Sequence, residues 1–340
     1  MGVQVIPFRE ELLPQAGTLL ARRHCSDRVS LPELPARYED LASSQQAVQT
    51  SLTRPHASGF AAVAGDQLVA YLIGDMVIDN LWGRSAWVRS AGCAYDPAVG
   101  VEIVRDLYAA LGERWVRYGI FTHYALIPVS DPALIQAWFS LSFGSEQIHA
   151  LADLPALKPE KPAMPPGIEI RKAGAEDRGH LAAMSDVIWK TQVKAPVWGV
   201  MFPETVHQTS EDWAGLPDEA EVTVWLAWMD QKVVGIQGYW PAEAALGASN
   251  DNLHIPESCV HMSVAGTREE ARGRGISTLL TQHGLAEAYE QGYQVCDTDW
   301  RSTNLLASRF WPRQGFRPVT YRLVRRIDAR IAWADGNVQG

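Results

Sequence analysis

The sequence lacks the features of membrane-spanning and disulfide-rich proteins. It contains no run of 18 or more apolar residues, which is about the length that a transmembrane helix requires. Its start has no basic segment followed by an apolar one, so no secretory signal is expected. The 4 cysteines among 340 residues are far apart and form no CxxC or Cys/His cluster. These absences predict a cytoplasmic protein with reduced thiols, without a membrane partner and without a metal site.

Basic charge is also scarce. Lys and Arg number 30 against 39 Asp and Glu, which gives a net charge of -9. This balance argues against a nucleic-acid partner, although a local basic pocket for an anionic cofactor is compatible with it. The rest of the composition is that of a globular protein, with 47% hydrophobic, 20% charged and 9% aromatic residues. The length predicts two domains rather than one.

A proline-rich segment divides the chain. Residues 155–167 contain five prolines, which are incompatible with a helix interior or a central strand. We therefore predict a stiff linker at 155–167 between a first domain, 1–154, and a second domain, 168–340. Each is long enough to bury its own core.

The two halves share a residue spacing that indicates a tandem duplication. The offset is 164 between Asp66 and Asp230, and 173 between Trp138 and Trp311. A nine-residue insertion in the loop 242–256 of the second half accounts for the change. The same order of strands and helices occurs in both halves, and this mixture predicts an α/β or α+β layer fold.

In the second half, strands and helices are predicted to alternate after a hairpin over 222–238. Apolar periodicity and turn residues predict strands over 259–267, 294–299 and 316–326, and helices over 276–291 and 304–313.

A glycine-rich segment links the first of these strands to its helix. Gly273 and Gly275 allow a tight turn with several N–H groups pointing into one concavity, and the helix that follows adds its dipole. Arg272 and Arg274 add positive charge. The segment predicts a phosphate or pyrophosphate site; the alternative is an exposed basic turn with a glycine-assisted helix start.

The segment Arg272–Ile276 resembles the acyl-CoA loop of the GCN5-related N-acetyltransferase (GNAT) superfamily, R/Q-x-x-G-x-G/A. Further residues of the family pattern follow at matching spacings: Gly292, Asn304, Ala307, Trp311, Gly315 and Phe316. The resemblance covers the second half directly and the first half only through the duplication.

This resemblance implies two tandem acyl-CoA N-acyltransferase domains, each with a mixed, mostly antiparallel central sheet flanked by helices. It implies acetyl-CoA as co-substrate and no metal. The strand 259–267 would hold the pantetheine arm, and one of its N–H groups would polarise the thioester carbonyl. The implied cofactor-binding residues are Ala265, Thr267, Arg272, Gly273, Arg274, Gly275, Ile276, Ser277, Asn304 and Trp311. For Asn304, a helix N-cap is an alternative that is compatible with pantetheine binding.

The sequence departs from the family where the general acid is expected. The family has a tyrosine at the position of Trp311, and an indole N–H donates hydrogen bonds but no proton near neutral pH. Either the thiolate leaves unaided, or water protonates it, or another group replaces the tyrosine; Tyr321 on the last strand is the candidate for that role. His261 and Asp299 are predicted bases for an ammonium acceptor, with Asp297 on the same strand face as Asp299. A structural role is the alternative for each of them.

The first half departs further, as a degenerate copy. It has Asp96 and no arginine at the loop, and Asp131 replaces Asn304. Its expected role is either to support the other copy or to shape the acceptor pocket. Cys259 and Cys296 make an acyl-enzyme conceivable, but their place within strands predicts burial.

Together these features predict an acetyl-CoA-dependent N-acetyltransferase that moves an acetyl group directly to the amine of a small molecule. The protein is expected to be a monomer or a homodimer. Two alternatives remain: a non-catalytic acyl-CoA-binding module, and an acyltransferase or decarboxylase that uses another acyl-CoA.

Overall fold

The computed structural model describes residues 2–242 and 252–334. Among these residues, contacts divide the chain into two compact units. The first unit holds the residues up to Ile148, the segment 252–256 and the residues from Pro318 on. The second holds the residues from His149 to 242 and Glu257–Arg317.

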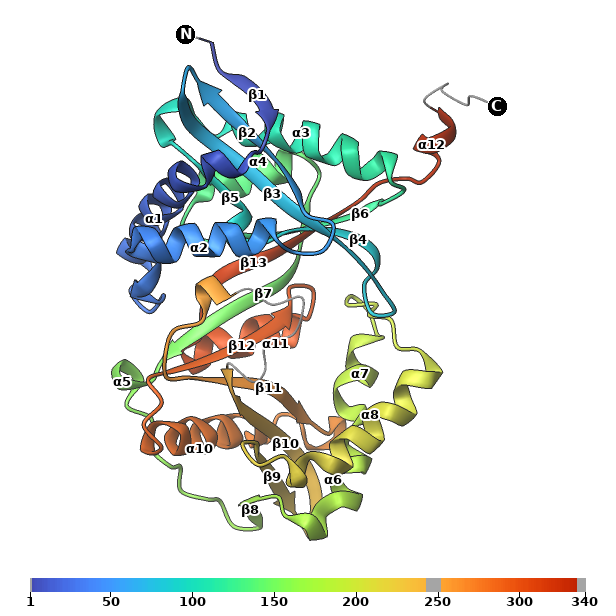
Figure 1. The fold of residues 1–340 in the computed structure, drawn as a ribbon. Coiled ribbons are helices and arrows are strands. Elements are labelled where there is room, and N and C mark those ends of the chain that lie inside the picture. The colour runs from blue at the N-terminus through green and yellow to red at the C-terminus, as the bar shows by residue number, and fades with distance from the viewer. Residues whose placement is uncertain (1, 243–251, 335–340) are drawn as a thin grey trace. The chain divides into compact units, whose positions relative to one another are not determined.

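The first unit is a sheet with helices on both faces (Figure 1). Its strands lie in the order β1-β2-β3-β4-β6-β13, and β5 pairs with β3. On β3, Leu72 packs with Leu107 of α3, whereas its neighbour Ile73 packs with Leu20 of α1. Adjacent strand residues face opposite sides, so α3 and α1 cover opposite faces. The elements are β1 Gln4–Pro7, α1 Leu13–Ser30, α2 Leu41–Leu52, β2 Ser58–Ala64, β3 Gln67–Asp79, β4 Gly83–Val88, β5 Cys93–Tyr95, α3 Glu102–Arg117, β6 Thr122–Pro128, α4 Pro132–Ser140, β13 Arg317–Arg326 and α12 Ile331–Ala334.

The second unit has the strand order β12-β11-β10-β9-β8. A Cβ built on Gly235 of β10 would lie 2.9 Å from Ile276 Cγ2 on α10, whereas the adjacent Ile236 packs with Leu181 of α6. Therefore α10 covers one face, and α6, α7 and α8 cover the other. The elements are α5 Leu154–Leu157, β8 Ile168–Lys172, α6 Arg178–Met184, α7 Asp186–Gln192, α8 Pro203–Gly215, β9 Thr223–Met229, β10 Lys232–Pro241, β11 Cys259–Thr267, α10 Ile276–Glu290, β12 Val295–Arg301 and α11 Leu305–Phe310. The remaining strand, β7 Gly144–Asp153, runs from the first unit into the second.

The strands β11 and β12 are parallel neighbours over only part of their length. Cys259–His261 pair with Val295–Asp297, and the pairing ends there although both strands continue. On its other side, β11 has a bulge against β10 that leaves Ser263 without an opposite residue. The two strands therefore separate beyond His261, next to this bulge.

The strand and helix predictions for the second half agree with these bounds to within a few residues, except that the predicted helix 304–313 is α11 followed by the short 3-10 helix Trp311–Gln314. The predicted repeat is visible in the element bounds. Strands β6 and β12 differ by 173 residues at both ends, and so do β7 and β13. The predicted insertion in the loop 242–256 falls largely on residues outside those described.

The boundaries of the two compact units differ from the predicted domain ranges at two strands. Strand β13, expected in the second domain, pairs antiparallel with β6 of the first unit, with Tyr321 opposite Ile127. Conversely, residues 149–153 of β7 belong to the second unit, where Leu154 donates its N–H to Gln294 O at 3.0 Å. The ranges 1–154 and 168–340 stay a prediction; in the structure, each half contributes chain to the other half's unit.

Candidate functional site

The glycine-rich loop has the backbone conformation that the sequence predicts. Gly273 and Gly275 have φ values of 76° and 79°, in the left-handed region that glycine adopts without strain. Apart from the adjacent residues, no heavy atom of the described chain lies within 4 Å of a Cβ built on either residue, so the backbone conformation rather than crowding requires glycine. Gly275 precedes α10 and provides no side-chain cap for its first N–H groups. The helix start is therefore open to an anionic ligand.

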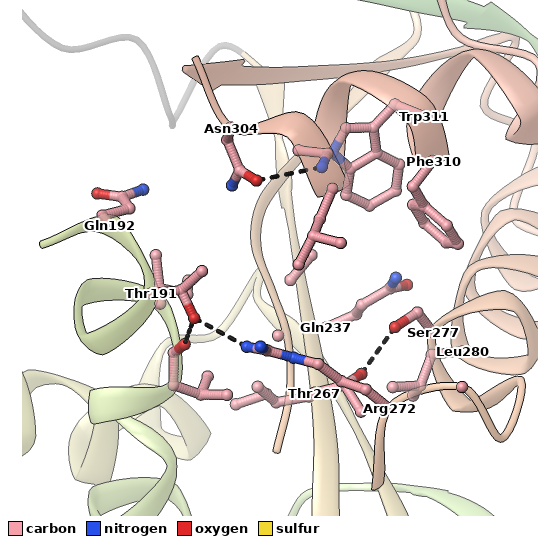
Figure 2. Close-up of a pocket in the computed structure, with 18 residues that line it drawn as sticks. Thr191, Gln192, Gln237, Thr267, Arg272, Ser277, Leu280, Asn304, Phe310 and Trp311 are labelled. Atoms are coloured by element: carbon pink, nitrogen blue, oxygen red, sulfur yellow. Dashed lines mark hydrogen bonds between the residues drawn. The ribbon is translucent and has the colours of Figure 1, made fainter. Parts of the chain in front are cut away.

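The arginines of the loop point in different directions. Arg272 Nη2 donates to Thr191 Oγ1 on α7 at 2.9 Å and lines a pocket (Figure 2). Arg274 instead lies with Nη1 3.4 Å from Met229 Sδ on β9. Arg272 is thus the loop cation that faces the pocket.

The pocket has a volume of about 320 Å³ and lies between the loop, β11, α7 and α11 (Figure 2). Its walls are mostly apolar, and a Cβ on Gly266 would lie 2.3 Å from Val187 Cγ1, so α7 packs directly on β11. Thr267 Oγ1 and Ser277 Oγ hydrogen bond at 2.8 Å on its floor. The lining residues are Val187, Ile188, Thr191, Gln192, Ile236, Gln237, Ala265, Gly266, Thr267, Arg272, Gly273, Ser277, Leu280, Asn304, Leu306, Ala307, Phe310 and Trp311.

The structure brings most of the predicted cofactor-binding residues together. Seven of the ten line this pocket: Ala265, Thr267, Arg272, Gly273, Ser277, Asn304 and Trp311. Gly275 and the buried Ile276 form the start of α10 beside it, and Arg274 points elsewhere. Asn304 Oδ1 accepts the Ala307 N–H at 3.2 Å, so Asn304 is the N-cap of α11 as well as a lining residue.

Sequence reasoning missed the wall formed by α7. Val187, Ile188, Thr191 and Gln192 come from a helix far from the loop in sequence. Their amphipathic spacing indicates a helix but not the strand that the helix covers. Gln237 was missed as well, and no local signal distinguishes it from other strand residues.

Two predicted bases lie where β11 and β12 separate. His261 Nδ1 is 2.6 Å from Asp297 Oδ2, and both residues are buried. Burial lowers the pKa of His261, but the hydrogen bond to Asp297 and the charges of Asp297 and Asp299 raise it more, so the pKa lies above its usual value. Asp299 Oδ2 is 3.8 Å from His149 Nδ1. These four side chains do not line the pocket described above.

The sequence profile of the acetyltransferase (GNAT) family matches residues 188–316. This range includes the loop, β11, β12 and α11. Residues 188–316 belong to the GNAT acetyltransferase family.

Solved structures extend the likeness of fold to nearly the whole chain. A GCN5-related N-acetyltransferase from Sphaerobacter thermophilus aligns over 96% of both chains, with a TM-score of 0.57 and 16% identity. A tandem GNAT protein from the clavulanic acid biosynthesis pathway aligns over 96% of this chain and 99% of its own, with a TM-score of 0.52 and 15% identity. A glucosamine N-acetyltransferase region of a fungal multi-domain β-N-acetylglucosaminidase covers 95% of this chain and 38% of that one, with a TM-score of 0.55 and 16% identity. No curated protein sequence matches the chain. The chain therefore has a tandem GNAT fold.

The GNAT family uses acyl-CoA, and the pocket suits such a molecule. The loop N–H groups and Arg272 match a pyrophosphate, and the apolar walls match the pantetheine arm. Among the described residues, no cluster of three or more His, Cys, Asp or Glu side chains is arranged to hold a metal ion. No described helix is both long and apolar enough to cross a bilayer.

Three further predicted groups in the chain have distinct surroundings. Trp311 is buried in the GNAT domain, with its ring centroid 5.4 Å from that of Phe316. Cys259 and Cys296 are buried as predicted, and burial raises the pKa of both thiols well above their usual range, which makes them poor nucleophiles. Tyr321 packs against the core of the first unit and is not among the pocket-lining residues. Its role as an acid stays a prediction.

The first copy differs from the GNAT pocket at the corresponding place. Tyr95 at the end of β5 donates to Asp131 Oδ2 at 2.8 Å, and Asp131 caps α4. Asp96 accepts the Ala98 N–H, so a carboxylate holds the turn that corresponds to the glycine-rich loop, and this turn contains no arginine. This turn is poorly suited to a pyrophosphate, as the sequence predicts.

Proposed function

We propose that the protein transfers an acetyl group from acetyl-CoA to the amine of a small molecule, directly within a ternary complex. The observation that carries the proposal is the pocket between the glycine-rich loop, β11, α7 and α11. The GNAT family match supports the general reaction, and the acetyl group and the small amine are the specific part of the proposal.

Residues on and next to β11 have different roles in the proposed reaction. Arg272 and the N–H groups at the start of α10 bind the pyrophosphate, and the apolar walls hold the pantetheine arm. A backbone N–H of β11, which has a bulge at Ser263, donates to the thioester carbonyl in this proposal and stabilises the charge that develops as the amine attacks. His261 is the base that removes a proton from the ammonium acceptor, and the carboxylate of Asp299 attracts that cation.

A second function is favoured by one observation. Trp311, which cannot donate a proton, occupies the position of the family's tyrosine and is buried. This substitution is compatible with a module that binds acyl-CoA without turning it over, or with an enzyme that uses another acyl-CoA.

Thiol release distinguishes these functions. Acetyl-CoA is mixed with the protein and a panel of primary amines, and CoA thiol is measured with a chromogenic disulfide; longer acyl-CoAs serve as parallel donors. Amine-dependent release from acetyl-CoA is the expected result. Tight acetyl-CoA binding in calorimetry without release on any amine would contradict the enzyme and support the binding module.

A further inference from the structure

A histidine–aspartate pair lies at the point where β11 and β12 separate. His261 and Asp297 are opposite each other in the last pair of their parallel register, and Nδ1 lies 2.6 Å from Oδ2. The side chain of Asp297 is 3% exposed and that of His261 is 10% exposed. The carboxylate is thus almost fully enclosed, while the imidazole still reaches solvent.

The pair faces the side of the sheet covered by α6, α7 and α8. Trp240, opposite His261 on β10, packs against the core on that side. Thr298, the neighbour of Asp297, points the other way and donates to Met262 O at 2.9 Å. Asp297 Oδ1 is buried and makes no hydrogen bond to any residue of the described ranges. A carboxylate with one oxygen on the imidazole and the other unpartnered is poorly explained as a purely structural contact, because an unpartnered buried oxygen lowers stability.

The chemistry needs a proton donor as well as an acceptor. An ammonium acceptor must lose a proton before it attacks, and the leaving thiolate must gain one. Trp311 cannot supply that proton, and the buried thiols of Cys259 and Cys296 have raised pKa values. Tyr321, the acid predicted from the sequence, packs against the core of the first unit and does not line the pocket.

We propose that Asp297 is a positioning residue that fixes the tautomer of His261, so that this one imidazole both takes the proton of the amine and returns it to the departing thiolate. The inference rests on the function proposed above. A carboxylate at Nδ1 keeps a proton on that nitrogen, and Nε2 is then the nitrogen that accepts and donates.

The proton transfers of the reaction balance with the imidazole of His261 as the one protein group involved. Nε2 of His261 takes one proton from the ammonium nitrogen, whose lone pair then forms the C–N bond to the carbonyl carbon. The C–S bond breaks, and its electron pair stays on sulfur. His261 returns its proton to this sulfur, and a second proton leaves the nitrogen for solvent, which gives the amide and the CoA thiol.

The groups around His261 determine whether the reaction rate rises or falls with pH. Asp297 and Asp299 of β12 favour the imidazolium, and His149 of β7 lies beside Asp299. On β10 the facing residue is the uncharged Trp240, whose Nε1 donates to Glu219 Oε2 at 3.2 Å. Cys259 on β11 itself is buried. The rate therefore rises with pH as His261 loses its proton, and removing the charge of Asp297 moves that rise to lower pH.

The test is Asp297→Asn, measured as kcat and as the pH profile of kcat/KM. The asparagine amide donates to Nδ1 and forces the proton onto Nε2, so kcat is expected to fall by about a hundredfold or more, with KM for acetyl-CoA unchanged. The inflection of the profile is expected to move to lower pH. Asp177→Asn is the matched control, because Asp177 is an equally buried carboxylate of the same unit that pairs with Arg171. It is expected to lower Tm but to keep the wild-type inflection.

An Asp297→Asn enzyme with the wild-type inflection, or with a kcat no lower than that of Asp177→Asn, would overturn the inference while leaving the acetyltransferase intact. Absence of turnover on any amine would instead overturn the proposed function. The imidazole 15N shifts of His261 provide a readout that needs no turnover. A proton on Nδ1 in the wild type that moves to Nε2 in Asp297→Asn is expected, and a wild-type proton on Nε2 would refute the tautomer.

Discussion

At the scale of single residues, the two arginines of the loop have different surroundings despite their symmetrical placement in the sequence. Arg272 faces the pocket and Arg274 lies against Met229. The sequence gives both residues the same charge, but in the structure Arg272 contacts Thr191 and Arg274 contacts Met229. Their contributions to ligand binding should therefore differ.

Arg272→Ala is expected to weaken acetyl-CoA binding by about tenfold to a hundredfold. A hydrogen bond to a charged group contributes about 1.5–3 kcal/mol, and 1.4 kcal/mol corresponds to a tenfold change in Kd. Isothermal titration calorimetry measures the effect, with Arg274→Ala as the matched control and a smaller loss expected there. Unchanged affinity in the double variant would contradict the assignment of the loop.

A buried histidine in the first unit makes stability depend on pH. His123 is fully buried, with Nδ1 2.8 Å from Tyr108 Oη and Nε2 3.1 Å from Ile120 O, so its neutral form is satisfied at both nitrogens. Burial, with a smaller contribution from the charge of Arg325, lowers its pKa to about 4 from 6.5. Below pH 6.5 the unfolded chain binds a proton that the folded chain does not, so this stability is present above 6.5 and is lost as the pH falls towards 4.

The free energy of unfolding should therefore fall by about 2 kcal/mol between pH 7 and pH 5 through this residue. Urea titrations at the two pH values measure it, and the difference should shrink by that amount in His123→Gln. His207, whose side chain is 82% exposed, provides the control His207→Gln. An equal pH effect in the wild type and in His123→Gln would show that His123 does not titrate in this way.

At the scale of elements, folding of the first unit depends on the last strand, β13. Thr320–Arg326 of β13 pair with Thr122–Pro128 of β6, and Leu323 is fully buried in the core there. Arg322 adds a bond from Nε to Glu146 Oε2 at 2.7 Å. The first unit thus depends on a strand that the sequence places nearly two hundred residues after β6.

A chain ending after Phe316 is expected to lose cooperative folding and to aggregate. It lacks the strand that satisfies the edge of β6, and loss of a buried leucine side chain alone costs about 2–5 kcal/mol. Solubility and thermal melting by circular dichroism measure this outcome. A chain ending after Arg330 keeps β13 and should melt like the full chain. A soluble, cooperatively melting protein ending at Phe316 would contradict this dependence.

Most elements were predictable because their signals are local. The strand 259–267, the helix after Gly275 and the strand near 294–299 follow from apolar periodicity and from glycine at the turn, and they agree with β11, α10 and β12. The unit to which the final strand belongs was not predictable. Its apolar alternation specifies a strand with one buried face but not the strand with which it pairs.

At the scale of the whole molecule, the two copies have the same element plan and different chemistry. In the second copy a cationic loop, β11, α7 and α11 surround a pocket. In the first copy, the hydrogen bond from Tyr95 to Asp131 joins the end of β5 to the start of α4, the counterparts of β11 and α11. The first copy therefore has no counterpart of the arginine-containing loop, and a purely structural role for it stays a prediction.

Calorimetry is accordingly expected to show one acetyl-CoA per chain. In the first copy, the carboxylate of Asp96 and the hydrogen bond from Tyr95 to Asp131 disfavour binding of a diphosphate. Arg272→Ala with Arg274→Ala should weaken this one binding event. Two equivalents per chain, or one equivalent that the double variant leaves untouched, would contradict the assignment of the pocket to the second copy.

The sequence by itself determined the loop, its glycines, the helix that follows and the duplicated plan, because each depends on residues within one turn or on a repeated spacing. Tertiary structure decided that Thr191 meets Arg272, that His261 meets Asp297 and that β13 completes the sheet of the first unit. These contacts depend on which strands and helices become neighbours and in which register. Burial of apolar faces selects those neighbours, and the sequence of one segment does not indicate which other segment it will contact.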